Sequence, residues 1–149
     1  MEEKKILGKL AEYIKKNPQL VQASGGNISC KINNEIMRIK ASGRKIQDIN
    51  YKKGYVDVNF VKIRNLILKP KKSKIDLEDF KILKNQNKVS IEVYFHAILG
   101  KIVFHTHPTK LNSILCSTNA KLIIKKYFKS KNFIEYVKPG YELGIEIYK

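Results

Sequence analysis

Residues 90–108 (SIEVYFHAILGKIVFHTHP) constrain the fold most, because they join an apolar helix to a short apolar strand that ends in two histidines. Residues i and i+2 of a strand point to the same face. His105 and His107, at the end of the strand predicted over residues 101–105, can therefore converge on one point, with Glu92 on the preceding helix. Imidazoles that converge often bind a metal ion. The alternative is a pair of hydrogen-bonded polar residues at a strand end.

Length and composition predict one globular domain over residues 1–149, with 43% hydrophobic and 29% charged residues. No stretch is long and apolar enough to be a transmembrane helix, and the charged N-terminus is unlike a signal peptide. Cys30 and Cys116 have no C-x-x-C spacing, so they do not indicate a disulfide framework. We therefore expect a cytoplasmic protein that does not interact with a membrane.

The formal net charge of +17, from 30 Lys and Arg against 13 Asp and Glu, has three explanations. One is a nucleic-acid partner, another is a phosphorylated or otherwise anionic substrate, and the third is a Lys-, Asn- and Ile-rich genome background. The lysines are spread over the whole chain, and no Arg-rich helix or RNP-like aromatic motif is present. Charge alone therefore does not favour a nucleic-acid partner.

Hydrophobic periodicity and turn residues predict the remaining elements. Helices are expected over residues 2–17, ended by Pro18, and over 110–117. Strands are expected over 27–32 and 36–41, as a hairpin around Asn33 and Asn34, over 55–60 with 61–68 as its partner, and over 133–137. The basic run 69–74 is expected to be a solvated loop, residues 76–87 have no clear pattern, and residues 141–149 are expected to form a helix or a strand.

Two small polar turns are candidates for binding an anion. The run ASGGNIS at residues 23–29 contains Gly25 and Gly26, which can bring bare backbone N–H groups close to a ligand. It is neither a Walker loop nor a G-x-G-x-x-G motif, and a tight turn before a strand is the alternative. Ser42 and Gly43, followed by two basic residues, form a second turn. This turn either completes an anion pocket with the first or is a plain surface turn.

These motifs, taken in order, resemble the class II aldolase/adducin family. They are SGGNIS at 24–29, ASG at 41–43, SIE at 90–92 with His96 four residues after Glu92, VFHTHP at 103–108, and VKPG at 137–140. The resemblance covers nearly the whole chain. It implies an α/β fold of three α/β/α layers around a central mixed, largely antiparallel sheet. The family's last strands lie beyond the segment matched by residues 139–149, so they are expected to be missing here.

The resemblance also implies the site residues. His105 and His107 match two of three zinc-binding histidines, Glu92 matches the catalytic carboxylate, and His96 is expected to be packed or hydrogen-bonded and not a ligand. The third zinc histidine belongs to a strand that this sequence does not reach, so Glu92 could serve as the third protein ligand with water in the open position. The residues implied in phosphate binding are Gly25, Gly26, Asn27, Ser42, Gly43 and Ser90.

The implied activity is that of a zinc-dependent sugar-phosphate aldolase, which cleaves its substrate through a metal-stabilised enediolate. Glu92 would move the proton at the adjacent carbon, and a raised pKa would suit that role. Epimerases and dehydratases of the same family use related chemistry. The substrate would be a small phosphorylated sugar, aldehyde or ketone, and a homo-oligomer is expected because relatives form tetramers. The alternative is a non-catalytic, adducin-type domain that binds a partner or acts as a scaffold.

Overall fold

The computed structural model describes residues 3–50, 52–69, 76–84, 87–128 and 133–149. A four-stranded sheet lies at the centre, in the order β3-β2-β1-β4, and every strand pairing among the described residues is antiparallel. The sheet expected to be mixed and largely antiparallel is thus antiparallel throughout this part of the chain. Its strands are β1 (Asn27–Lys31), β2 (Ile36–Lys40), β3 (Tyr55–Asn59) and β4 (Ile102–His105). The predicted hairpin of β1 and β2 around Asn33 and Asn34 is confirmed, as is the strand that ends at His105.

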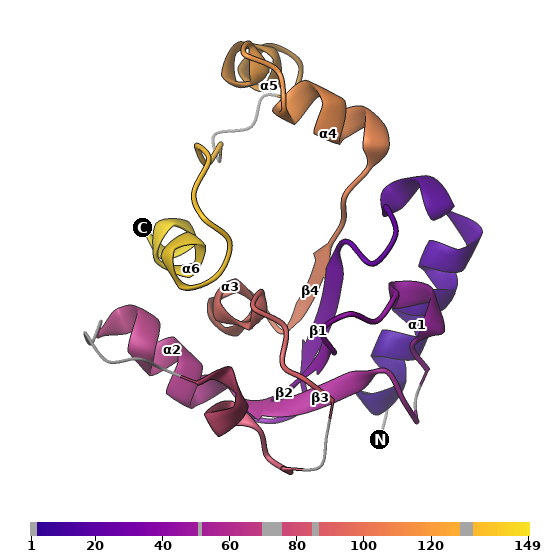
Figure 1. Ribbon diagram of the computed structural model, residues 1–149, viewed down its shortest axis with the longest axis vertical. Helices are drawn as coiled ribbons and strands as arrows, with labels where there is room; N and C mark the ends of the chain where they lie inside the picture. Colours follow the sequence, from indigo (N-terminus) through magenta and orange to yellow (C-terminus); the bar gives the residue numbers. More distant parts are fainter. Residues whose placement is uncertain (1–2, 51, 70–75, 85–86, 129–132) are drawn as a thin grey trace.

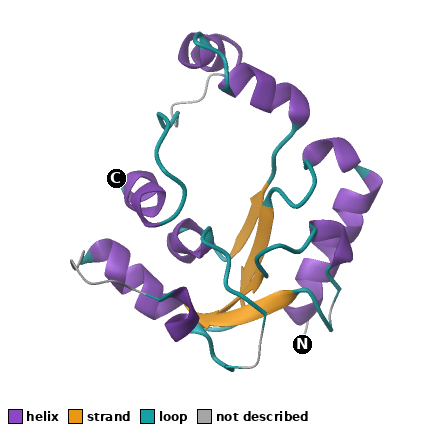
Figure 2. Ribbon diagram, viewed as in Figure 1, coloured by secondary structure: helices purple, strands orange, loops and turns teal. Residues whose placement is uncertain are grey.

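Helices cover both faces of this sheet, which confirms the three-layer α/β/α architecture (Figures 1 and 2). Helix α1 (Glu3–Lys16) packs on one face, whereas α2 (Phe60–Leu68), α3 (Val93–Ile98) and α6 (Tyr141–Tyr148) lie together on the other. Helices α4 (Thr109–Leu115) and α5 (Ala120–Phe128) follow β4 and lie away from the sheet (Figure 1). Three short 3-10 helices complete the described elements: Pro18–Leu20, Ile46–Asp48 and Leu77–Phe80.

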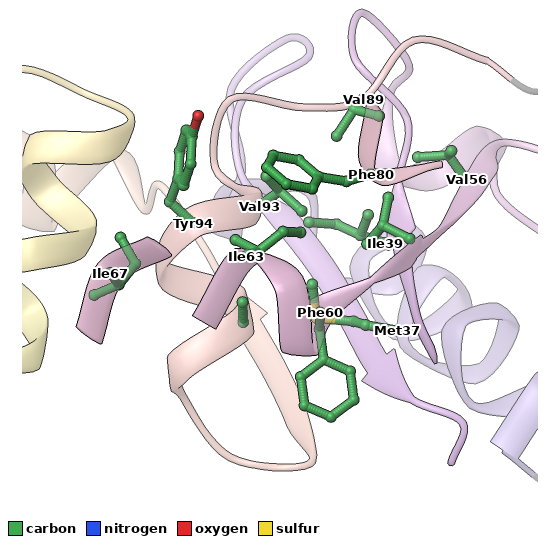
Figure 3. Close-up of a cluster of buried hydrophobic side chains, with 12 residues drawn as sticks. Met37, Ile39, Val56, Phe60, Ile63, Ile67, Phe80, Val89, Val93 and Tyr94 are labelled. Carbon is green, nitrogen blue, oxygen red and sulfur yellow. The ribbon is translucent and has the colours of Figure 1, made fainter. Parts of the chain in front are cut away.

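Alternation along the strands sends apolar side chains to two separate cores. The core under α1 contains Leu7, Ala11, Ile14, Ile28 and Cys30, all at most 1% exposed. The core under α2 and α3 is shown in Figure 3. Each fully buried aliphatic side chain contributes ~1.5–3 kcal/mol, against ~0–1 kcal/mol for an exposed ion pair, so these cores supply most of the stability. The second core is built mainly from Met37, Ile39, Val56, Val58, Phe60, Ile63, Ile67, Phe80, Val89 and Val93.

The prediction that residues 61–68 form a strand beside β3 is wrong, because this segment is helix α2. The side chain of Asn59 accepts a hydrogen bond from the backbone N–H of Lys62, which caps the first turn of the helix. Phe60, Ile63 and Ile67 recur at helical spacing and are all buried in the core. Burial along one helical face thus outweighs the strand propensity of the isoleucines and valine.

Near the C-terminus, the strand predicted over residues 133–137 is also wrong, because this segment has no regular structure and Tyr136 is 91% exposed. The alternatives left open for residues 141–149 are resolved in favour of α6, where Gly144 lets the helix approach Ile67 and Tyr94. The helix predicted over 110–117 is confirmed as α4. The basic run 69–74 lies outside the described residues except for Lys69. Among the helices of the described chain, none combines the length and apolar character that crossing a bilayer requires.

Candidate metal centre

Three side chains that the sequence singles out meet at one end of the sheet. Glu92, His105 and His107 each offer a ligand atom, and these atoms all lie within 4.8 Å of one another. Glu92 Oε1 is 3.0 Å from His105 Nδ1, and His105 Nε2 is 3.0 Å from His107 Nε2. The spacing of two residues between the histidines therefore produces the convergence expected of it.

The two histidines are positioned by backbone contacts on both sides. His105 is the last residue of β4 and pairs with Asn27 at the start of β1. The backbone N–H of His107 donates to the carbonyl oxygen of Leu20 at 2.9 Å. Glu92 immediately precedes α3, so its carboxylate meets the strand end where the helix begins. One helix start and one strand end thus bring the acid and the two rings together.

The donor set fits a divalent metal ion. His105 Nδ1 is buried and, although 3.0 Å from Glu92 Oε1, it has no hydrogen bond of acceptable geometry to any described residue. Leaving a polar nitrogen buried without a partner costs free energy, which a bound cation would recover. One carboxylate and two imidazoles are ligands that zinc prefers, and three protein ligands with an open position are typical of catalytic sites.

Glu92 is ionised at neutral pH. Burial by itself raises the pKa of its carboxyl group, but the imidazole of His105 at 3.0 Å, together with the hydrogen bond from Asn27, outweighs burial and lowers the pKa to about 2. Asn27 Nδ2 donates to Glu92 Oε2 at 2.7 Å. The raised pKa that would suit proton transfer is therefore absent from this arrangement, because the imidazole at 3.0 Å has a larger effect than burial.

The segments implied in phosphate binding are connected to one another by hydrogen bonds. Asn27 Nδ2 donates to Ser90 Oγ at 3.0 Å, which joins the first glycine turn to the residues before α3. The backbone N–H of Ser42 donates to the carbonyl oxygen of Lys88 at 3.0 Å, which joins the second turn to the same segment. Asn27 Oδ1 is buried and has no partner among the described residues, so the amide retains an acceptor.

Sequence reasoning missed Lys40, which connects the two turns directly. Its ammonium donates to the carbonyl oxygens of Ser24, at 3.3 Å, and Arg44, at 2.9 Å, and the residue is only 3% exposed. Burial lowers the pKa of Lys40, and the negative charge of Glu92 opposes this shift. An ammonium has three N–H donors, so one remains for an anion. The sequence signal that could have identified Lys40 is its position at the end of the predicted strand 36–41, two residues before Ser42.

The conformation of the turns depends on glycine. Gly26 has φ of +73°, and a Cβ atom there would lie 2.7 Å from the carbonyl oxygen of His105. At Gly25, a Cβ atom would lie 2.9 Å from the Gln22 carbonyl oxygen and 3.0 Å from His107 Nδ1. Gly43 also has a positive φ, +72°, but with open space around it. The backbone of the first turn therefore contacts His105 and His107 so closely that no side chain larger than that of glycine fits at residues 25 and 26.

His96 lies next to this site without joining it. Its side chain is fully buried, with Nδ1 2.7 Å from Ser29 Oγ, and it is not one of the three residues whose ligand atoms converge. Burial lowers the pKa of His96 to about 3, so the ring is neutral at physiological pH. This placement agrees with the expected packed and hydrogen-bonded role.

These shifts predict that the protein loses stability in acid. Because the pKa of His96 is about 3 in the folded protein and about 6.5 when unfolded, the unfolded chain binds more protons between these values. The free energy of unfolding should therefore fall as the pH drops below ~6.5, by up to ~1.4 kcal/mol per pH unit for this one proton. Glu92 adds a further loss below its unfolded pKa of 4.5. Urea unfolding at several pH values measures this dependence. His96→Gln is expected to flatten the slope of unfolding free energy against pH between pH 6.5 and 4.5. An unchanged slope in this variant would contradict the prediction.

Comparisons with known proteins identify the family and the fold. The family model for the class II aldolase and adducin N-terminal domain matches residues 9–147. The N-terminal class II aldolase domain of a conserved protein from Thermoplasma acidophilum superposes with a TM-score of 0.79 at 23% identity, covering 95% of this chain and 71% of that one. L-fuculose 1-phosphate aldolase gives a TM-score of 0.53 at 19% identity, covering 77% of this chain and 48% of that one. The chain thus matches about half the length of that enzyme. Curated protein sequences gave no match.

Proposed function

The chain belongs to the class II aldolase and adducin family, and from this we propose that it is a zinc-dependent lyase that cleaves a sugar phosphate by a retro-aldol reaction. The observation that carries the proposal is the convergence of Glu92, His105 and His107 within 4.8 Å, directly beside Asn27 and Ser90. Residues that could hold a metal ion thus lie next to residues that could bind a phosphate, and this supports a phosphorylated ketose as the proposed substrate.

Glu92, His105 and His107 would hold the zinc ion, which when bound supplies a Lewis acid for the oxygen atoms of the substrate. His105 Nδ1, which has no hydrogen-bond partner among the described residues, supports this assignment. The third ligand is then a carboxylate and not a third histidine.

The substrate phosphate would bind where the two glycine turns and the start of α3 meet. The donors proposed there are the hydroxyl groups of Ser42 and Ser90 and the remaining N–H of Lys40. Asn27 contributes by position, because its amide already donates to Ser90 and Glu92 and so ties the first turn to the start of α3. Because hydrogen bonds already connect these segments, the donors are held in place before the phosphate arrives. Phosphate binding can then be used to orient the carbon–carbon bond toward the metal centre.

Glu92 would be the proton-transfer group of the reaction. Its carboxylate would accept the hydroxyl proton of the carbon that becomes the aldehyde and return it to the carbon that keeps the electron pair of the broken bond. In the free protein the pKa of Glu92 is about 2, chiefly because His105 outweighs burial. A substrate that takes the place of the carboxylate at the metal would move Glu92 away from His105. Burial would then be the main influence on the carboxyl group and would raise its pKa toward the range useful for proton transfer.

The reaction can be tested with zinc-loaded protein and phosphorylated ketoses such as L-fuculose 1-phosphate, with products identified by NMR spectroscopy. Cleavage into an aldehyde and a ketone phosphate is expected, and Glu92→Gln should lower kcat by ~100-fold or more, the usual contribution of a proton-transfer group. Zinc content is measured in parallel, because Glu92 is also a proposed ligand. An epimer or a dehydration product without cleavage would overturn the lyase assignment in favour of another reaction of the family. Glu142→Gln, on the exposed first turn of α6, is the matched control.

A further inference from the structure

We propose that the protein has a second anion site, suited to a small phosphate ester, at the end of the sheet opposite the metal centre. A cavity of about 710 Å³ lies there between the end of β1, one face of α2 and the loop before β4. Three cations line it: Lys31, Arg64 and Lys101. None of the described residues that line it is acidic.

Two of these cations, Lys31 and Arg64, form no ion pair with any residue that the structure describes. The ammonium of Lys31 donates to the carbonyl oxygen of Leu99 and lies 4.8 Å from the centre of the Phe60 ring. Arg64 is exposed and forms no hydrogen bond or ion pair with any residue that the structure describes. Its five N–H donors are therefore available in the planar arrangement that suits phosphate.

Repulsion between the cations supports an anionic ligand. Burial, and then the positive charge of Arg64, lowers the pKa of Lys31. No described residue that lines the cavity places a carboxylate between these two cations. An anion that binds in the space they share would therefore interact favourably with both. A phosphate group carries the charge and the number of acceptor oxygens to interact with more than one of them at once.

The rest of the cavity favours a ligand that has a carbon body as well as a phosphate. Residues 60, 61, 64, 65 and 68 form one face of α2, and Phe60, Val61 and Leu68 present apolar surface beside the cations. The volume lies within the range of small-molecule sites, ~300–1,000 Å³. A phosphate ester of moderate size therefore fits better than inorganic phosphate alone.

This site is separate from the metal centre. Strand β1 begins at Asn27, beside His105, and ends at Lys31 in the cavity wall. Helix α3 likewise runs from Glu92, which precedes it, to Leu99, whose carbonyl oxygen accepts from Lys31. Ligands at the two ends of these elements would not compete for the same residues, so the second site extends the proposed function without depending on it.

The site can be tested by titrating ¹⁵N-labelled protein with phenyl phosphate and following backbone amide shifts. Saturable shifts are expected for residues 31–34, 64–65 and 100–101, and any binding at the glycine turns is read separately from residues 25–27 and 42–43. Arg64→Gln should weaken binding at the cavity by ~10-fold, because it removes a charged hydrogen-bond donor. Lys62→Gln is the matched control: it removes one charge from the same helix, outside the cavity lining, and should leave the affinity within about twofold.

Several outcomes would overturn the site. Equal weakening by Arg64→Gln and Lys62→Gln would show that only overall charge attracts the ligand. Equally strong binding of phenol would show that the cavity recognises the ring and not the phosphate. Absence of saturable shifts in residues 31–34, 64–65 and 100–101 would show that the cavity does not bind phosphate esters. Tighter binding of a short single-stranded DNA at these same residues, with a steep salt dependence, would assign the surface to nucleic acid instead.

Discussion

Replacement of His105 by alanine is expected to abolish stoichiometric zinc binding while leaving the fold intact. His105 is within 3.0 Å of both Glu92 and His107, so its removal takes the central ligand out of the set. Removing a residue that only forms a hydrogen bond to a metal ligand typically lowers metal affinity ~10–100-fold. Removing a ligand itself should therefore lower zinc affinity by at least ~100-fold. His107→Ala should have a comparable effect, because it leaves Glu92 and His105 as the only two protein ligands of the proposed set.

Zinc content after dialysis, and competition with a chromophoric chelator, measure this effect without an activity assay. Thr106→Ala is the matched control, because it alters the same segment between the two ligands without removing a donor of the proposed set. Circular dichroism checks that each variant is folded. If the unaltered protein binds no zinc and His105→Ala and His107→Ala are equally folded, the metal site is refuted and the non-catalytic, adducin-type role becomes the better assignment.

Gly26→Ala is expected to destabilise the protein by ~2–5 kcal/mol. The left-handed conformation, with φ of +73°, costs an alanine ~1–2 kcal/mol. The added Cβ atom would also lie 2.7 Å from the His105 carbonyl oxygen, with Val21 and Ile46 side chains at 3.2 and 3.3 Å. Such overpacking costs a further ~1–3 kcal/mol. Because the overlapping atom belongs to His105, the same substitution should weaken zinc binding.

Gly43→Ala separates the two contributions. Its φ of +72° is nearly the same, but nothing lies within 4 Å of the Cβ position, so only the conformational cost of ~1–2 kcal/mol applies. Urea unfolding of both variants measures the difference. A loss at Gly26 no larger than that at Gly43 would show that the turn can move away from β4, and that the close approach to His105 is not required for the fold.

The sequence alone was sufficient for the elements whose signals are local. The turn at Asn33 and Asn34 predicts the hairpin, and the alternation expected of a strand predicts that His105, the last residue of β4, and His107 lie on one side. The motif order predicts the three-layer fold of the family. The same local reasoning misassigned residues 61–68, because an apolar stretch with isoleucine and valine suits a strand or a helix, and packing of Ile63 and Ile67 against the sheet decides between them.

Properties that depend on contacts across the chain were decided only by the tertiary structure. The low pKa of Glu92 arises from His105, thirteen residues later, and from Asn27 on another strand. Lys40 gains its role from carbonyl oxygens of two separate turns, and the cavity of Lys31 and Arg64 joins a strand to a helix. The sequence by itself determined which side chains share one face of each helix or strand, because the periodicity of the backbone fixes this. Charge, burial and hydrogen bonding between elements depend on distances in space, and these exist only once the chain has folded.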